Sequence, residues 1–123
     1  MSVSTQTVGA NLTARVHHDP SLGAIKQAFH ASAETIRQVY VDNSLNAVVV
    51  YVKIWDLAVG SVTVGTTEAD LVIPVPASTI MSYPLDENGL ALATALTSAC
   101  LTGADVGSTA GPGNNVPVKI QAS

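Results

Sequence analysis

The segment AVVVYVKIWDL, residues 47–57, constrains the fold more than any other part of this chain. Alternate residues of a β-strand point to opposite faces, and β-branched side chains favour strands. One row of the segment is β-branched and is predicted to face a core: Val48, Val50, Val52 and Ile54. The other row is amphipathic: Val49, Tyr51, Lys53 and Trp55. We therefore expect a central strand whose second face is covered, either by a loop of the same chain or by another subunit.

Period-two alternation broken by turn residues continues through most of the sequence. It predicts further strands over residues 11–17, 35–43, 69–78, 79–85 and 116–121. Pro74 and Pro76 remove two N–H donors from the same side of one of these strands. That strand is therefore expected at the edge of a sheet.

Two segments fit more than one structure. The Ala and Leu content of residues 90–101 favours a helix, but the alternation and the strand-like surroundings favour a strand, which we predict. In residues 21–30, Leu22, Ile25 and Phe29 have helical spacing while Gly23 weakens a helix. We expect a short helical turn or an irregular connection there.

Together these segments predict an all-β fold. With 123 residues, the chain is expected to form one domain, a small antiparallel β-sandwich or jelly roll of about seven or eight strands. We place this domain at residues 12–123, after an extended N-terminal arm over residues 1–11, and allow one short helix near 21–30.

Charge and composition argue against several classes of protein. The net charge is −4, and the five basic residues are scattered, so a phosphate-tracking groove for nucleic acid is not expected: Arg15, Lys26, Arg37, Lys53 and Lys119. No basic and apolar leader and no run of roughly 18 apolar residues is present, which predicts a soluble protein made in a cytoplasm. Only 11% of residues are charged, and such a surface is easily covered by neighbours, which favours an assembling protein. The single Cys100 is expected in the core.

Candidates for catalysis are few, and we predict no enzyme and no cofactor. His17, His18 and Asp19 could ligate a metal, but adjacent strand residues point to opposite faces. We favour exposed polar residues at a strand end, with a site built from one of these histidines and His30 as the alternative. The carboxylates of Glu68 with Asp70, and of Asp86 with Glu87, are expected to be solvated.

Tyr51 and Trp55 form the remaining binding feature, because they lie on the same face of one strand. Such a pair can fill a second small core under a loop, form a protein interface, or stack on a sugar. These three possibilities stay open at the level of sequence.

Four short motifs give the chain a resemblance to a small β-sandwich found among virion proteins of tailed bacteriophages. They are Val41-Asp42-Asn43, Tyr51-Val52-Lys53-Ile54-Trp55-Asp56, Pro74-Val75-Pro76-Ala77 and Asn88-Gly89-Leu90. The resemblance extends from residue 40 to about residue 96, and residues 16–32 have no counterpart in it.

This resemblance implies a structural role in a virion. We expect a capsid decoration (cement) protein, often a trimer, that bridges major-capsid subunits on the capsid surface and binds neither nucleic acid nor membrane. A component of a tail, baseplate or fibre, or a carbohydrate-binding module for host attachment, is the alternative. The expected contacts are the aromatic face and the arm, which we predict to be disordered in the free protein: Tyr51, Lys53, Trp55, Ser2, Val3, Ser4, Thr5, Gln6 and Thr7.

Overall fold

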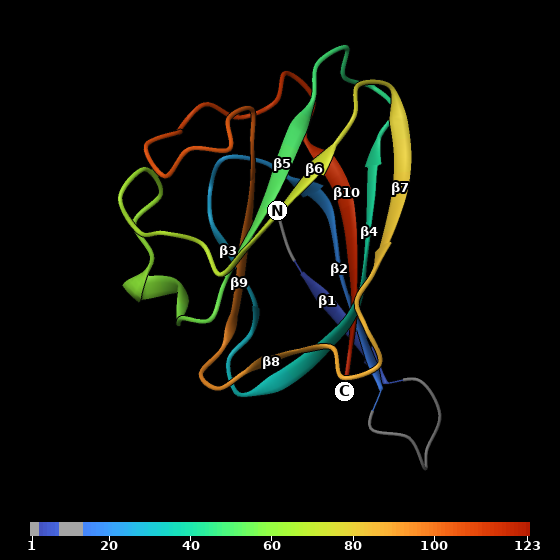
Figure 1. The fold of residues 1–123 in the computed structure, drawn as a ribbon, viewed down its shortest axis with the longest axis vertical. Helices are drawn as coiled ribbons and strands as arrows, with labels where there is room; N and C mark the ends of the chain where they lie inside the picture. The colour runs from blue at the N-terminus through green and yellow to red at the C-terminus, as the bar shows by residue number, and fades with distance from the viewer. Residues whose placement is uncertain (1–2, 8–13) are drawn as a thin grey trace.

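Two antiparallel sheets pack face to face in this protein (Figure 1). The computed structural model describes residues 3–7 and 14–123. The six-stranded sheet has the order β1-β2-β10-β4-β7, with β8 also paired to β4: β1 (Ser4–Thr7), β2 (Arg15–Leu22), β10 (Val116–Ala122), β4 (Glu34–Asn43), β7 (Thr79–Pro84) and β8 (Leu90–Leu92). The four-stranded sheet has the order β3-β9-β5-β6: β3 (Gln27–His30), β9 (Leu96–Leu101), β5 (Val50–Trp55) and β6 (Leu71–Val75). The predicted all-β sandwich is confirmed.

Alternation of side chains builds the core between the two sheets. Val50, Val52 and Ile54 are fully buried there, as their β-branched row predicts. Val48 belongs to the same row in sequence but precedes β5 and is 52% exposed, so its predicted burial is wrong. The proline strand β6 lies at the end of the four-stranded sheet and pairs with β5, which confirms its place at an edge.

The short helix allowed near residues 21–30 does not form, although all of these residues are described, and this part of the prediction is wrong. β2 continues to Leu22, and after a turn β3 pairs with β9 through Gln27 and Ala28. Phe29 is buried, whereas Ile25 is 73% exposed, so the apolar residues do not share the face that a helix would require. The residues 90–101 form strands β8 and β9, as predicted. The described chain thus has ten strands, more than the seven or eight expected.

Asp56, at the end of the β5 segment, fixes the turn between β8 and β9. Its carboxylate accepts hydrogen bonds from three consecutive backbone N–H groups, those of Ala93, Thr94 and Ala95. Partial burial by itself would raise the pKa of Asp56, but these three donors outweigh it and the pKa is lowered. The ionised form of Asp56 is therefore the form that holds this turn.

Asp56→Asn is expected to lower the free energy of unfolding by about 1–2 kcal/mol, because an amide accepts these bonds less strongly than a carboxylate. The folded-state pKa is below the unfolded value of about 3.9, so this stabilisation is complete above that value and is lost as pH falls through the folded pKa. Urea unfolding of both proteins across this range measures the effect. A difference that stayed constant down to the lowest pH would contradict it.

Candidate functional site

Three titratable side chains from both sheets meet in one cluster, which we call the His-Glu cluster: His17, His30 and Glu34. His17 comes from β2 and Glu34 is the first residue of β4, both in the six-stranded sheet. His30 is the last residue of β3 in the four-stranded sheet. The cluster therefore joins the two layers of the sandwich.

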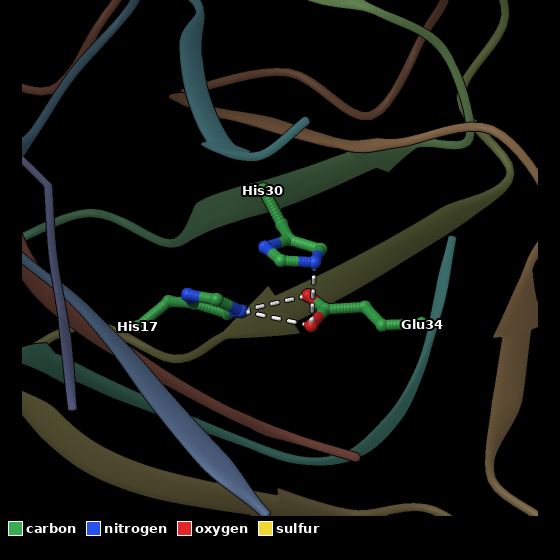
Figure 2. Close-up of side chains that lie close together, drawn as sticks. All are labelled: His17, His30 and Glu34. Carbon is green, nitrogen blue, oxygen red and sulfur yellow. Dashed lines mark hydrogen bonds and ion pairs between the residues drawn. The ribbon is translucent and has the colours of Figure 1, made fainter. Parts of the chain in front are cut away.

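Both imidazoles point their Nε2 atoms at the same carboxylate (Figure 2). His17 Nε2 lies 2.7 Å from Glu34 Oε1 and 3.0 Å from Oε2, and His30 Nε2 lies 3.7 Å from Oε2. The side chains of His17 and Glu34 are completely buried, while that of His30 is 23% exposed. The cluster is thus closed on the side of His17 and reaches solvent through His30.

Three neighbouring polar groups complete the surroundings of the cluster. Arg15 donates to Glu34 Oε2 from Nη2 at 3.2 Å and from Nε at 3.4 Å. The hydroxyl of Thr5 lies 2.7 Å from His17 Nδ1, and that of Ser32 lies 3.1 Å from His30 Nε2. Each imidazole of the cluster therefore also contacts a hydroxyl group, and the carboxylate also accepts from Arg15.

The pKa values of Glu34 and His30 are both lowered, but for different reasons. Burial alone would raise the pKa of Glu34, but the hydrogen bonds from His17 and Arg15 and the electrostatic interaction with the two histidines outweigh it, so this pKa is lowered. Burial lowers the pKa of His30, although the charge of Glu34 opposes the shift. Glu34 is accordingly an ionised carboxylate, and the neutral form of His30, which carries a lone pair for a ligand, is favoured.

The sequence identified only part of this cluster. Exposed polar residues were expected at 17–19, but His17 and Asp19 are fully buried and only His18 is partly exposed. The alternative placed one of the two histidines beside His30, and in the structure His17 lies beside His30. Glu34 was missed, although it follows His30 by four residues in the segment HASAE.

Asp19 lies outside the His-Glu cluster. Its Oδ1 accepts a hydrogen bond from the Ser21 N–H at 2.9 Å. Among the buried side-chain atoms of residues 3–6 and 14–123, the Oδ2 of Asp19 is the one without a hydrogen-bond partner. Burial raises the pKa of this carboxyl group.

The aromatic row of β5 is covered largely by the chain's own loops. Trp55 is 1% exposed and packs with Val62 and Ala99, and its indole Nε1 donates to the carbonyl oxygen of Thr67 at 3.0 Å. Lys53 is 3% exposed and donates from Nζ to the carbonyl oxygen of Asp105 at 2.6 Å. For these two residues, a local cover replaces the expected subunit contact.

Two loops provide this cover, residues 57–69 and 102–115, and they lie on the same side of the molecule (Figure 1). Gly65 has a φ of +95°, and a Cβ there would meet the methyl group of Thr109, which shows how closely the loops pack. Tyr51 is half-buried, so its role in an interface stays a prediction.

The N-terminal contact residues lie in or next to an edge strand. Residues 4–7 form β1, paired with β2, instead of the disordered arm that the sequence predicts. Val3 packs against the core, and Ser4, Thr5 and Gln6 are exposed. Ser2 and residues 8–13 lie outside the described residues, so the boundary of an arm at residue 11 stays a prediction.

A shallow depression of about 230 Å³ lies on the outer face of the six-stranded sheet. Four polar side chains, one aliphatic side chain and one aromatic ring line it: Val16, Gln38, Tyr40, Ser82, Lys119 and Gln121. The ammonium group of Lys119 stands 5.7 Å from the centre of the Tyr40 ring. Sequence reasoning missed this face, because its residues come from four strands that are separated along the chain.

Comparison with known proteins does not assign this chain to a family. No family model, no curated protein and no solved structure matches this chain at a significant level. The described residues contain one short 3-10 helix, η1 (Val59–Ser61), and no helix that is long and apolar enough to cross a membrane. The chain is therefore characterised by its fold, a small all-β sandwich of two antiparallel sheets.

Proposed function

We propose that this chain is a non-enzymatic structural protein of a bacteriophage virion, a capsid decoration protein that docks through the outer face of its six-stranded sheet. The virion role comes from the four motifs of the sequence. The docking face comes from one observation, the depression around Tyr40 on an open sheet face.

This face has the composition that a docking surface needs. Tyr40 and Val16 supply half-buried apolar area, and Gln38, Gln121 and Ser82 supply hydrogen-bond partners at modest desolvation cost. The same face extends onto β1, because Gln6 pairs with Val16 of β2 and Ser4 pairs with His18 of β2. Ser4 and Gln6, two of the predicted N-terminal contacts, therefore continue the surface of the depression.

The mechanism is clamping. A protein that contacts several capsid subunits at once raises the cost of separating any two of them, because each separation also exposes part of the docked surface. Aromatic residues near the centre of such a contact carry a large share of the binding energy.

Two tyrosines on opposite outer faces provide a matched test. Tyr40→Ala is expected to weaken binding to virions stripped of this protein at least about tenfold, which corresponds to about 1.4 kcal/mol. Tyr51→Ala removes the contact that the sequence predicts on the outer face of the four-stranded sheet, and it is expected to bind normally if the six-stranded sheet is the docking face. Co-sedimentation with purified particles measures both, and imaging of particles with and without the protein locates it. Normal binding by Tyr40→Ala, or loss with Tyr51→Ala alone, would contradict the assignment of the docking face.

Carbohydrate recognition is the second candidate, favoured by the aromatic ring and the amide groups of the same depression. We rank it lower because Lys119 stands over the ring that a sugar would need to stack on. A glycan array that shows specific binding, abolished by Tyr40→Ala while particle binding persists, would reverse this order.

A further inference from the structure

We propose that the His-Glu cluster is a binding site for a divalent first-row transition-metal ion of the Zn²⁺ class. The ligands are Nε2 of His17, Nε2 of His30 and one carboxylate oxygen of Glu34, with water completing the coordination. This inference stands on the cluster geometry and does not depend on the virion role.

The ligand atoms converge closely enough for one ion. One ligand atom from each of the three residues lies within 4.8 Å of the other two. Tetrahedral Zn²⁺ with bonds of about 2.0–2.1 Å spaces its ligands roughly 3.3 Å apart. The contact of 2.7 Å between His17 Nε2 and Glu34 Oε1 must open slightly, and His30 Nε2, which lies 3.7 Å from Glu34 Oε2, must approach Oε1.

The ligands also have the right chemistry and orientation. Two imidazoles with one carboxylate suit Zn²⁺ and its neighbours, whereas Mg²⁺ and Ca²⁺ prefer oxygen ligands. A metal-bound histidine usually donates its other ring N–H to a nearby acceptor, which fixes the ring. Thr5 Oγ1 stands 2.7 Å from His17 Nδ1 and can accept that hydrogen bond when Nε2 holds the ion. The side chain of His30, 23% exposed, gives the ion a route from solvent.

The positive charge of Arg15 repels the ion and lowers its affinity for the His-Glu cluster. Its guanidinium contacts Glu34 Oε2, so Oε1 is the oxygen that is free of Arg15 and available to the ion. A guanidinium within a few ångström of a dication raises the electrostatic cost of binding. The side chain of Arg15 is 30% exposed, so it can turn toward solvent when the ion enters.

The bound ion would tie the two layers of the sandwich together, because its ligands come from β2, β3 and β4. Anything that binds the folded state and not the unfolded state raises the apparent stability by mass action. The metal should therefore stabilise the whole domain and slow the opening of β3.

The first experiment measures the melting temperature of the full chain, treated with chelator and then titrated with ZnCl₂ or MgCl₂. At Zn²⁺ about 100-fold above its Kd, the melting temperature is expected to rise by about 10 °C, and MgCl₂ is expected to have no effect. His30→Ala should lose most of the Zn²⁺ shift while still folding, because its ring is partly exposed. His18→Ala is the matched control, since His18 lies next to His17 on the opposite face of β2, and it should keep the full shift.

The second experiment uses Co²⁺ as a spectroscopic probe and Arg15→Met as a gain-of-function variant. Co²⁺ bound by the cluster is expected to show intense visible absorption bands typical of low coordination number, which His30→Ala removes and His18→Ala keeps. Arg15→Met is expected to bind Zn²⁺ at least about tenfold more tightly, because it removes the competing cation. The proposal is overturned if Zn²⁺ produces no shift in the wild type, if the shift survives in His30→Ala, or if His18→Ala abolishes it.

Discussion

Trp55→Ala is expected to lower the free energy of unfolding by about 3–5 kcal/mol, the range for deleting a buried tryptophan. Trp55 is 1% exposed and, with Val62 and Ala99, forms the small core beneath the loop of residues 57–69. Its removal leaves a cavity between that loop and β9. Urea unfolding measures the loss, and hydrogen exchange is expected to show faster opening of residues 57–69.

Trp55→Phe is the matched control for this prediction. Phenylalanine keeps much of the packing and loses the hydrogen bond from Nε1 to the Thr67 carbonyl, so the expected cost is about 1–2 kcal/mol. Trp55 is the only tryptophan of the chain, and its fluorescence should be poorly quenched by iodide in the free protein. Efficient quenching, or a Trp55→Ala variant as stable as the wild type, would show that the loop does not cover the Trp55 ring. Trp55 would then again be a candidate for an interface contact.

Asn43→Asp is expected to lower the free energy of unfolding at least as much as Trp55→Ala does, although Asn and Asp side chains have nearly the same shape. The Asn43 Nδ2 group donates to three carbonyl oxygens, those of Val48, Val75 and Pro76, at 3.1, 3.3 and 2.9 Å. The substitution would place a carboxylate oxygen against these acceptors, in a site that is 0% exposed. An unpaired buried charge of this kind costs about 3–5 kcal/mol.

The control for this second prediction is Asn46→Ala, in the same network. Asn46 Nδ2 donates to Asn43 Oδ1 at 2.9 Å and to the Asn114 carbonyl at 2.8 Å, and its Oδ1 accepts from the Asn114 N–H at 2.9 Å. Its loss removes these hydrogen bonds but introduces no buried charge. We expect a cost of about 1–3 kcal/mol, measured by the same unfolding experiment. If Asn43→Asp were less destabilising than Asn46→Ala at neutral pH, Asn43 would not be the centre of this network.

Several residues of the sequence motifs have structural explanations. Asn43 connects the turn after β4 to the end of β6, and Asp56 binds the turn between β8 and β9. Gly89 has a φ of +66°, and a Cβ there would meet the carbonyl oxygen of Ile36. These residues therefore account for strand ends and turns of the sandwich, whatever the protein binds.

The candidate sites were harder to predict than the strands for a physical reason. Burial of Val50 and Val52 follows from local alternation, whereas the partners of Trp55 come from a loop that returns to the strand after leaving it. The His-Glu cluster needs three strands from two sheets, and only the packing of the sheets brings His30 to Glu34 and His17. Long-range contacts of this kind leave no periodic pattern in the sequence.

The sequence by itself determined the β class, the central β5 row, the edge position of the proline strand and the low surface charge, because each depends on local periodicity, backbone chemistry or composition. The tertiary structure decided which faces are covered and which polar groups meet. In the folded protein, two loops cover Trp55 and Lys53, and the carboxylate of Glu34 is buried between two histidines. Those outcomes depend on which distant segments pack together, and so they required the assembled sandwich.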